Sequence, residues 1–142
     1  MTPAATVLVC AIHLLGRSPE SFPRIELLAA RPPHASLNAE AFVDPRSGTI
    51  YVLTTSEVFR AAQAKRHCDS TEPLRKLASI LVHEEWHVLH GSDEGSAYAA
   101  QLTTVAMLSG PDSALYNSVR RSMVAVLAQR RTEQVASVAI RR

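Results

Sequence analysis

The sequence lacks the features that mark several common classes of protein. Its only two cysteines, Cys10 and Cys68, lie far apart and fit neither a disulfide framework nor a CxxC metal site. We therefore expect unpaired cysteines and a reducing compartment, the cytoplasm. No run approaches the roughly 18 apolar residues that a membrane span requires. The apolar stretch of residues 4–15 is interrupted by His13 and no positive residue precedes it, so it predicts a buried helix rather than a signal peptide.

A strong excess of charge is also missing. There are 15 Lys and Arg against 13 Asp and Glu, a formal net charge of +2. Nucleic-acid-binding domains concentrate basic residues on one face, so we expect no nucleic-acid partner and no membrane partner. The chain has 142 residues, of which 46% are hydrophobic. A chain of this size can bury a core without help from a metal. We expect a single α+β domain over residues 1–142, in which residues 132–142 form a flexible basic tail.

The clearest β signal lies in residues 39–55. Residues 39–43 and 49–55 flank the sequence Asp44-Pro45-Arg46-Ser47-Gly48. Proline suits the second position of a type I turn, and glycine can adopt the positive φ at its exit, so we predict a β-hairpin. Residues 24–30 predict a shorter strand, which ends before two consecutive prolines.

Helical signals occupy much of the remaining chain. Ser56 is a predicted N-cap, and Gly91 is expected to end the longest helix because glycine tolerates a left-handed turn. Ser92 then predicts the N-cap of the following helix, whose first turn holds Asp93 and Glu94. The expected helices cover residues 4–15, 56–65, about 70–90, 92–108 and 112–131.

The sequence His83-Glu84-Glu85-Trp86-His87 is an HExxH motif within the longest predicted helix. At 3.6 residues per turn, His83 and His87 project from one face, so both imidazoles can reach one Zn²⁺. Glu84 lies beside them, where it can accept a proton from a water bound to the metal. The same pattern would arise by chance in roughly 1–2% of scrambled chains, so its surroundings must also be weighed.

A catalytic zinc needs a third protein ligand and an open fourth position. The chain offers three candidates after the motif, namely His90, Asp93 and Glu94. His90 lies on the same helix as the two histidines, and Asp93 has the spacing at which metzincins place their third ligand. The metzincin motif also has a glycine before its third ligand, and the same interval counted from Gly91 ends on Glu94. We therefore favour Glu94, and the other two remain alternatives.

The pattern His83-Glu84-x-x-His87 followed by Glu94-x-x-Ala97 resembles the gluzincins, which are zinc peptidases. It looks most like the minigluzincins and the compact bacterial metallopeptidases related to phage-repressor-cleaving regulators. The resemblance covers residues 48–108. It implies Zn²⁺ on His83, His87 and Glu94, with Glu84 as the catalytic base. It also implies a small antiparallel sheet beside the active-site helix, with an edge strand that holds a peptide or protein substrate.

Residues 49–55 are the candidate for that edge strand. The alternative is that their side chains only face a core and a cover. Tyr98, one turn after Glu94, is a candidate oxyanion donor, although a tyrosine on an apolar helix more often belongs to the core. His67 or Tyr51 could take that role instead.

Three functions are consistent with this sequence. The first is a zinc metallopeptidase. The second is a zinc-binding regulatory or interaction protein with a peptidase-like fold and negligible turnover. The third is a metal-free helical interaction module. Retention of Glu84 favours the first, because binding a metal does not require a catalytic base.

Overall fold

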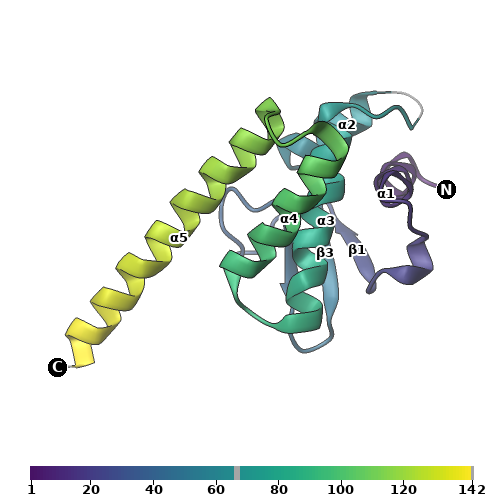
Figure 1. Cartoon of the computed structure of the whole chain (residues 1–142). Helices are drawn as coiled ribbons and strands as arrows, with labels where there is room; N and C mark the ends of the chain where they lie inside the picture. Colours follow the sequence, from purple (N-terminus) through teal and green to yellow (C-terminus); the bar gives the residue numbers. More distant parts are fainter. Residues whose placement is uncertain (66–67, 142) are drawn as a thin grey trace.

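The computed structural model describes residues 1–65 and 68–141, and it shows a small sheet surrounded by helices (Figure 1). The α+β class is as expected from the sequence. The elements follow one another as α1 (Pro3–Leu14), a short 3₁₀ helix (Pro19–Ser21), β1 (Ile25–Leu28), β2 (Ala41–Asp44), β3 (Thr49–Leu53), α2 (Glu57–Ala64), α3 (Glu72–His90), α4 (Glu94–Ser109) and α5 (Ala114–Arg141).

Local sequence explains where most of the helices begin. The hydroxyl oxygen of Ser56 accepts a hydrogen bond from the backbone N–H of Phe59 at the start of α2, and Thr71 caps α3 in the same way. The predicted cap of α4 is wrong. Asp93 rather than Ser92 is the N-cap, and its carboxylate accepts a hydrogen bond from the Ser96 hydroxyl instead of from a backbone N–H.

The sheet is mixed rather than antiparallel, with strand order β1-β3-β2. The predicted hairpin is confirmed, because β2 and β3 pair in antiparallel register from Ala41↔Val52 to Asp44↔Thr49. In contrast, β1 pairs with β3 in parallel. This arises because residues 29–40 carry the chain past the end of β3 to the opposite edge of the sheet, where β2 begins.

β3 is therefore the central strand, and the prediction that residues 49–55 form the edge is wrong. Ile50 and Val52 are fully buried on the face that packs against the helices. The two edges of the sheet are β1 and β2.

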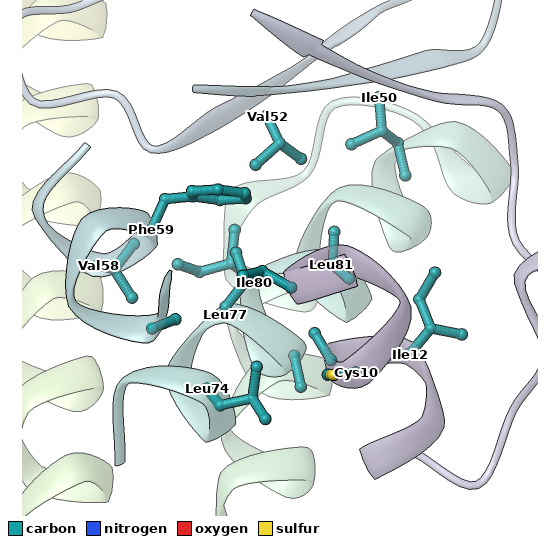
Figure 2. Packing of buried hydrophobic residues seen from close by; sticks show 14 of the residues in the cluster. Cys10, Ile12, Ile50, Val52, Val58, Phe59, Leu74, Leu77, Ile80 and Leu81 are labelled. Carbon is teal, nitrogen blue, oxygen red and sulfur yellow. The ribbon is translucent and has the colours of Figure 1, made fainter. Parts of the chain in front are cut away.

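The main core lies between the inner face of the sheet and helices α1, α2 and α3 (Figure 2). α3 occupies the centre, where it packs against α1, α2, α4, β2 and β3. An ion pair also fixes α3 to the segment that follows α1: the guanidinium of Arg17 donates to both carboxylate oxygens of Glu85, at 2.6 Å each. This bidentate ion pair holds both side chains in one orientation.

Cys10 and Cys68 form a disulfide, which corrects the expectation that they are unpaired. Their Cα atoms lie 5.2 Å apart although 58 positions separate them in the sequence. Packing of α1 against α3 brings Cys10 to the segment that precedes α3, and spacing along the chain does not reveal this proximity. The cysteines therefore give no reason to expect a reducing compartment. Among the described residues, no helix is long and apolar enough to cross a membrane.

α4 and α5 pack against each other through a second, smaller cluster. Its buried members are Leu102, Val105, Leu115 and Val119. α5 continues to Arg141 instead of ending near Arg131, and its last turns point away from the other elements (Figure 1). Side chains from 128 to 138 are exposed. Residues 132–141 are thus helical, and their flexibility in solution stays a prediction.

Candidate metal centre

Three side chains converge where α3 ends and α4 begins. His83 and His87 lie one turn apart on α3, with ring centroids 5.0 Å apart. Glu94 is the first residue of α4. One ligand atom from each of the three lies within 4.8 Å of the others, so this group could hold a metal ion.

The turn between the two helices accounts for this convergence. Gly91 ends α3 with φ 108°, a conformation that side-chain-bearing residues rarely adopt. Only Ser92 and Asp93 then separate it from α4, so Glu94 is returned towards the helix that has just ended. Its Oε1 contacts Nε2 of His87, and its Oε2 lies 3.6 Å from Nε2 of His83.

The two alternative third ligands lie elsewhere. The carboxylate of Asp93 is hydrogen-bonded to the Ser96 hydroxyl. His90 is exposed and packs beside Trp86, with ring centroids 4.9 Å apart. Neither belongs to the group of convergent ligand atoms. Trp86 also lies beside His87, at 5.9 Å between ring centroids, so it flanks the centre.

In each histidine of the group, Nδ1 lies at hydrogen-bond distance from a carbonyl oxygen. Nδ1 of His83 lies 2.8 Å from Oε1 of Gln101, and Nδ1 of His87 lies 2.7 Å from the backbone oxygen of Gly91. Carbonyl oxygens only accept hydrogen bonds, so both Nδ1 atoms carry the proton. The Nε2 atoms are the ones directed towards Glu94. This is the orientation in which a neutral imidazole offers a free nitrogen to a metal.

Glu84 is buried beside the group, and only 8% of its surface is exposed. Burial raises the pKa of its carboxyl, although the nearby charges of His83 and His87 oppose this effect. A carboxyl with a raised pKa holds a proton more readily than an ordinary glutamate, which suits a group that accepts a proton and passes it on.

Contact between Glu94 and His87 shifts the pKa values of these two residues in opposite directions. Burial alone would raise the pKa of Glu94, but hydrogen bonds and charges from the two histidines together lower it well below its usual range. The hydrogen bond to Glu94 raises the pKa of His87. The carboxylate is therefore ionised, and it is available as a ligand, over the ordinary range of pH.

The structure places Tyr98 next to His83, with ring centroids 4.6 Å apart in an edge-on arrangement. Tyr98 also packs against the cluster between α4 and α5. Burial, together with the charges of nearby carboxylates, raises the pKa of its hydroxyl to about 12. The hydroxyl therefore keeps its proton near neutral pH, so it can donate a hydrogen bond.

Of the two alternatives to Tyr98, the one that the structure describes, Tyr51, does not lie at the site. Tyr51 stacks on Phe42, with ring centroids 5.2 Å apart. It lies on β3 between Ile50 and Val52, and successive side chains of a strand point to opposite faces. Because Ile50 and Val52 face α3, Tyr51 faces the other side of the sheet. His67 lies outside the described residues.

Sequence reasoning did not identify Gln101 or Ser79. Gln101 donates through Nε2 to Oγ of Ser79, at 3.2 Å, and both side chains are buried. One signal could have revealed Gln101: it lies two helical turns after Glu94 and therefore shares a face of α4 with it. Among the described residues, no buried polar side-chain atom lacks a hydrogen-bond partner.

Comparison with known proteins adds no assignment to this site. No protein family matches the chain, and neither the curated proteins nor the solved structures contain a match. Functional inference therefore depends on the chemistry of the site. Two imidazoles, one carboxylate and a buried glutamate next to them can hold a metal ion and transfer a proton beside it.

Proposed function

We propose that the protein is a zinc-dependent peptidase that hydrolyses amide bonds. The observation that carries this proposal is the convergence of His83, His87 and Glu94, with Glu84 buried next to them. Two histidines and one glutamate form a ligand set of catalytic zinc sites in hydrolases, and they leave a fourth position open. The resemblance of the motif to gluzincins supports the same activity.

Each residue has a distinct role in this proposal. His83, His87 and Glu94 would hold the ion. Zinc bound there would polarise a substrate carbonyl and lower the pKa of a coordinated water. Glu84 accepts a proton at its carboxylate and delivers it to the departing amine. Tyr98 donates its hydroxyl to the oxygen on which negative charge develops.

The sheet offers a place for an extended peptide. We assign this role to β2, which is an edge strand and packs against α3, the helix that carries the two histidines. Glu40, directly before β2, is close enough to Tyr98 for its charge to raise the pKa of that hydroxyl. A peptide that pairs with β2 through main-chain hydrogen bonds would extend the sheet on the side of α4.

The test compares the wild type with Glu84→Gln. Both are analysed for zinc content and incubated with a mixed peptide library, whose products are identified by mass spectrometry. Glu84→Gln keeps the shape of the side chain but cannot accept the proton. We expect zinc to remain bound while cleavage falls by at least ~10²–10⁴-fold, the usual effect of losing a general base.

Glu85→Gln is the matched control, because Glu85 is the next residue and its carboxylate binds Arg17 instead of facing the metal centre. This variant should keep its activity and lose some stability. A zinc-loaded wild type that cleaves nothing would favour the alternative, a zinc-binding regulatory or interaction protein. Absence of zinc in a folded wild type would contradict both, and it would leave the metal-free interaction module.

A further inference from the structure

Gln101 links the metal centre to the interior of the protein. Its side chain is 5% exposed and bridges Nδ1 of His83 to the hydroxyl of Ser79, which is fully buried. Ser79 in turn donates its hydroxyl proton to the backbone oxygen of Lys76, at 2.7 Å. The bridge therefore joins α4 to the middle of α3, one turn before the first histidine.

We infer that Gln101 is a positioning residue, which selects the tautomer of His83 and supports it with a neutral partner. The inference deepens the proposed function, since the group that His83 would bind is the zinc of that proposal. It is carried by the order of donors and acceptors along the bridge.

That order allows only one arrangement of protons. The hydroxyl of Ser79 has a single proton, and the Lys76 carbonyl accepts it. Oγ of Ser79 can therefore only accept from Gln101, which directs the amide nitrogen towards Ser79 and the amide oxygen towards His83. The proton of His83 must then be on Nδ1, and Nε2 is left for the metal.

The hydrogen-bond partners behind the two histidines are uncharged, and this affects how strongly a metal would be held. A carboxylate behind a ligand histidine makes the ring more basic and strengthens its bond to the ion. Gln101 and the backbone oxygen of Gly91 carry no charge, so Glu94 supplies the only negative charge among the ligands and their supporting groups. A divalent ion held there keeps more of its positive charge than it would beside a carboxylate. The site thus favours polarisation of a carbonyl over tight retention of the ion.

The test measures zinc affinity by competition with a chromophoric chelator in three variants. Gln101→Met has similar length but only a weak acceptor in its thioether sulfur, and its affinity should fall by ~10–100-fold, the usual effect of losing such a partner. Gln101→Glu adds the negative charge, and it is combined with Ser79→Ala because Oγ of Ser79, whose proton goes to the Lys76 carbonyl, cannot donate to the new carboxylate oxygen. The affinity of this double variant should rise above that of the wild type. Thr103→Ala is the control, because Thr103 is an exposed residue of the same helix whose hydroxyl donates to the backbone oxygen of Ala99. It should leave the affinity unchanged.

A second measurement reports on the bridge without zinc. In ¹H–¹⁵N spectra of the metal-free protein, the Nδ1 proton of His83 should be protected from exchange. Gln101→Met should remove that protection and leave the Nδ1 signal of His87 in place. Ser79→Ala, which frees the amide to rotate, should weaken the protection partially. Ser79→Ala also provides the test if melting curves show that Gln101→Met does not fold.

The outcomes separate this inference from the proposed function. Unchanged protection and unchanged zinc affinity in Gln101→Met would overturn the role of Gln101, and the peptidase proposal would stand on the Glu84 test. A fall in affinity in Ser79→Ala/Gln101→Glu would overturn the role of neutrality. The wild type could cleave no peptide while Gln101 still protects the Nδ1 proton of His83 from exchange. That result would support the positioning role of Gln101 and contradict only the peptidase activity.

Discussion

The carboxylate of Glu94 contacts Nε2 of His87, although the two residues belong to different helices. The contact exists because α3 ends at a glycine with positive φ and α4 begins three residues later. It brings the acidic side chain to the face of α3 that carries both histidines.

The first prediction concerns the third ligand. Glu94→Ala should weaken zinc binding sharply, because it removes the only carboxylate of the convergent group. Asp93→Ala is the matched control: it removes a neighbouring carboxylate whose hydrogen bond goes to Ser96, and its cost should be limited to about 0.3–1 kcal/mol of helix-start stabilisation. Zinc affinity is measured by chelator competition. Loss of zinc in Asp93→Ala with retention in Glu94→Ala would contradict the assignment.

Removal of the metal should leave the protein folded. The main core lies between the sheet and helices α1 to α3, and zinc is not needed to assemble it. Zinc should raise the melting temperature by mass action, which corresponds to about 2.7 kcal/mol at a hundredfold excess over the dissociation constant. Circular dichroism before and after chelation checks this. Unfolding on chelation would show that the ion is structural.

Reduction of the Cys10–Cys68 disulfide should destabilise the protein without affecting zinc binding. The bond closes a loop of 58 residues, and the chain-entropy relation gives about 4 kcal/mol for that length. For a domain of this size, the loss corresponds to a fall in melting temperature of roughly 10–15 °C. Cys10→Ala/Cys68→Ala should reproduce the result. An equal melting temperature with and without reductant would contradict the stabilising role.

Glu84→Gln should stabilise the metal-free protein at neutral pH. Burial raises the pKa of Glu84 in the folded chain, so stability falls as the pH rises above the pKa of the unfolded chain, and the loss is complete once the pH exceeds the folded value. Below the ordinary glutamate pKa of about 4.3, both folded and unfolded chains are protonated and the cost disappears. Melting temperatures of the variant and the wild type should therefore differ at pH 7 and converge near about pH 4. A less stable variant at pH 7 would mean that ionised Glu84 is compensated in the folded state.

Tyr98→Phe tests the proposed oxyanion donor. The substitution keeps the ring that packs against His83, so folding and zinc binding should be retained. Cleavage should fall by ~10²–10³-fold, as when one such donor is lost from a hydrolase. Tyr116→Phe is the control, since Tyr116 packs against the same cluster between α4 and α5. Equal rates for both variants would show that Tyr98 only packs.

Local sequence signals were sufficient for most of the secondary structure. The proline and glycine of residues 44–48 predict the turn of the hairpin, and Ser56 and Gly91 mark a helix start and a helix end as expected. The cap of α4 was misassigned because Ser92 and Asp93 are both good capping residues. Their backbone angles distinguish them, and these depend on how the turn is packed.

The order of the strands could not be read from the sequence. Alternation along residues 49–53 is compatible with a central or an edge strand, because both have one face in the core. β3 becomes central only when residues 29–40 cross to the far edge of the sheet. The disulfide escaped prediction for a similar reason, since the proximity of Cys10 and Cys68 depends on how α1 packs against α3.

For the metal centre, the sequence by itself determined the placement of His83 and His87 on one face, because the period of an α-helix is set by backbone geometry. It also restricted the third ligand to a few residues after the motif. Among these candidates, tertiary structure places only Glu94 against the two histidines, and it also brings Gln101 behind His83 and Cys68 beside Cys10. Those relationships depend on the packing of separate elements, and the period of a single helix or strand does not determine that packing.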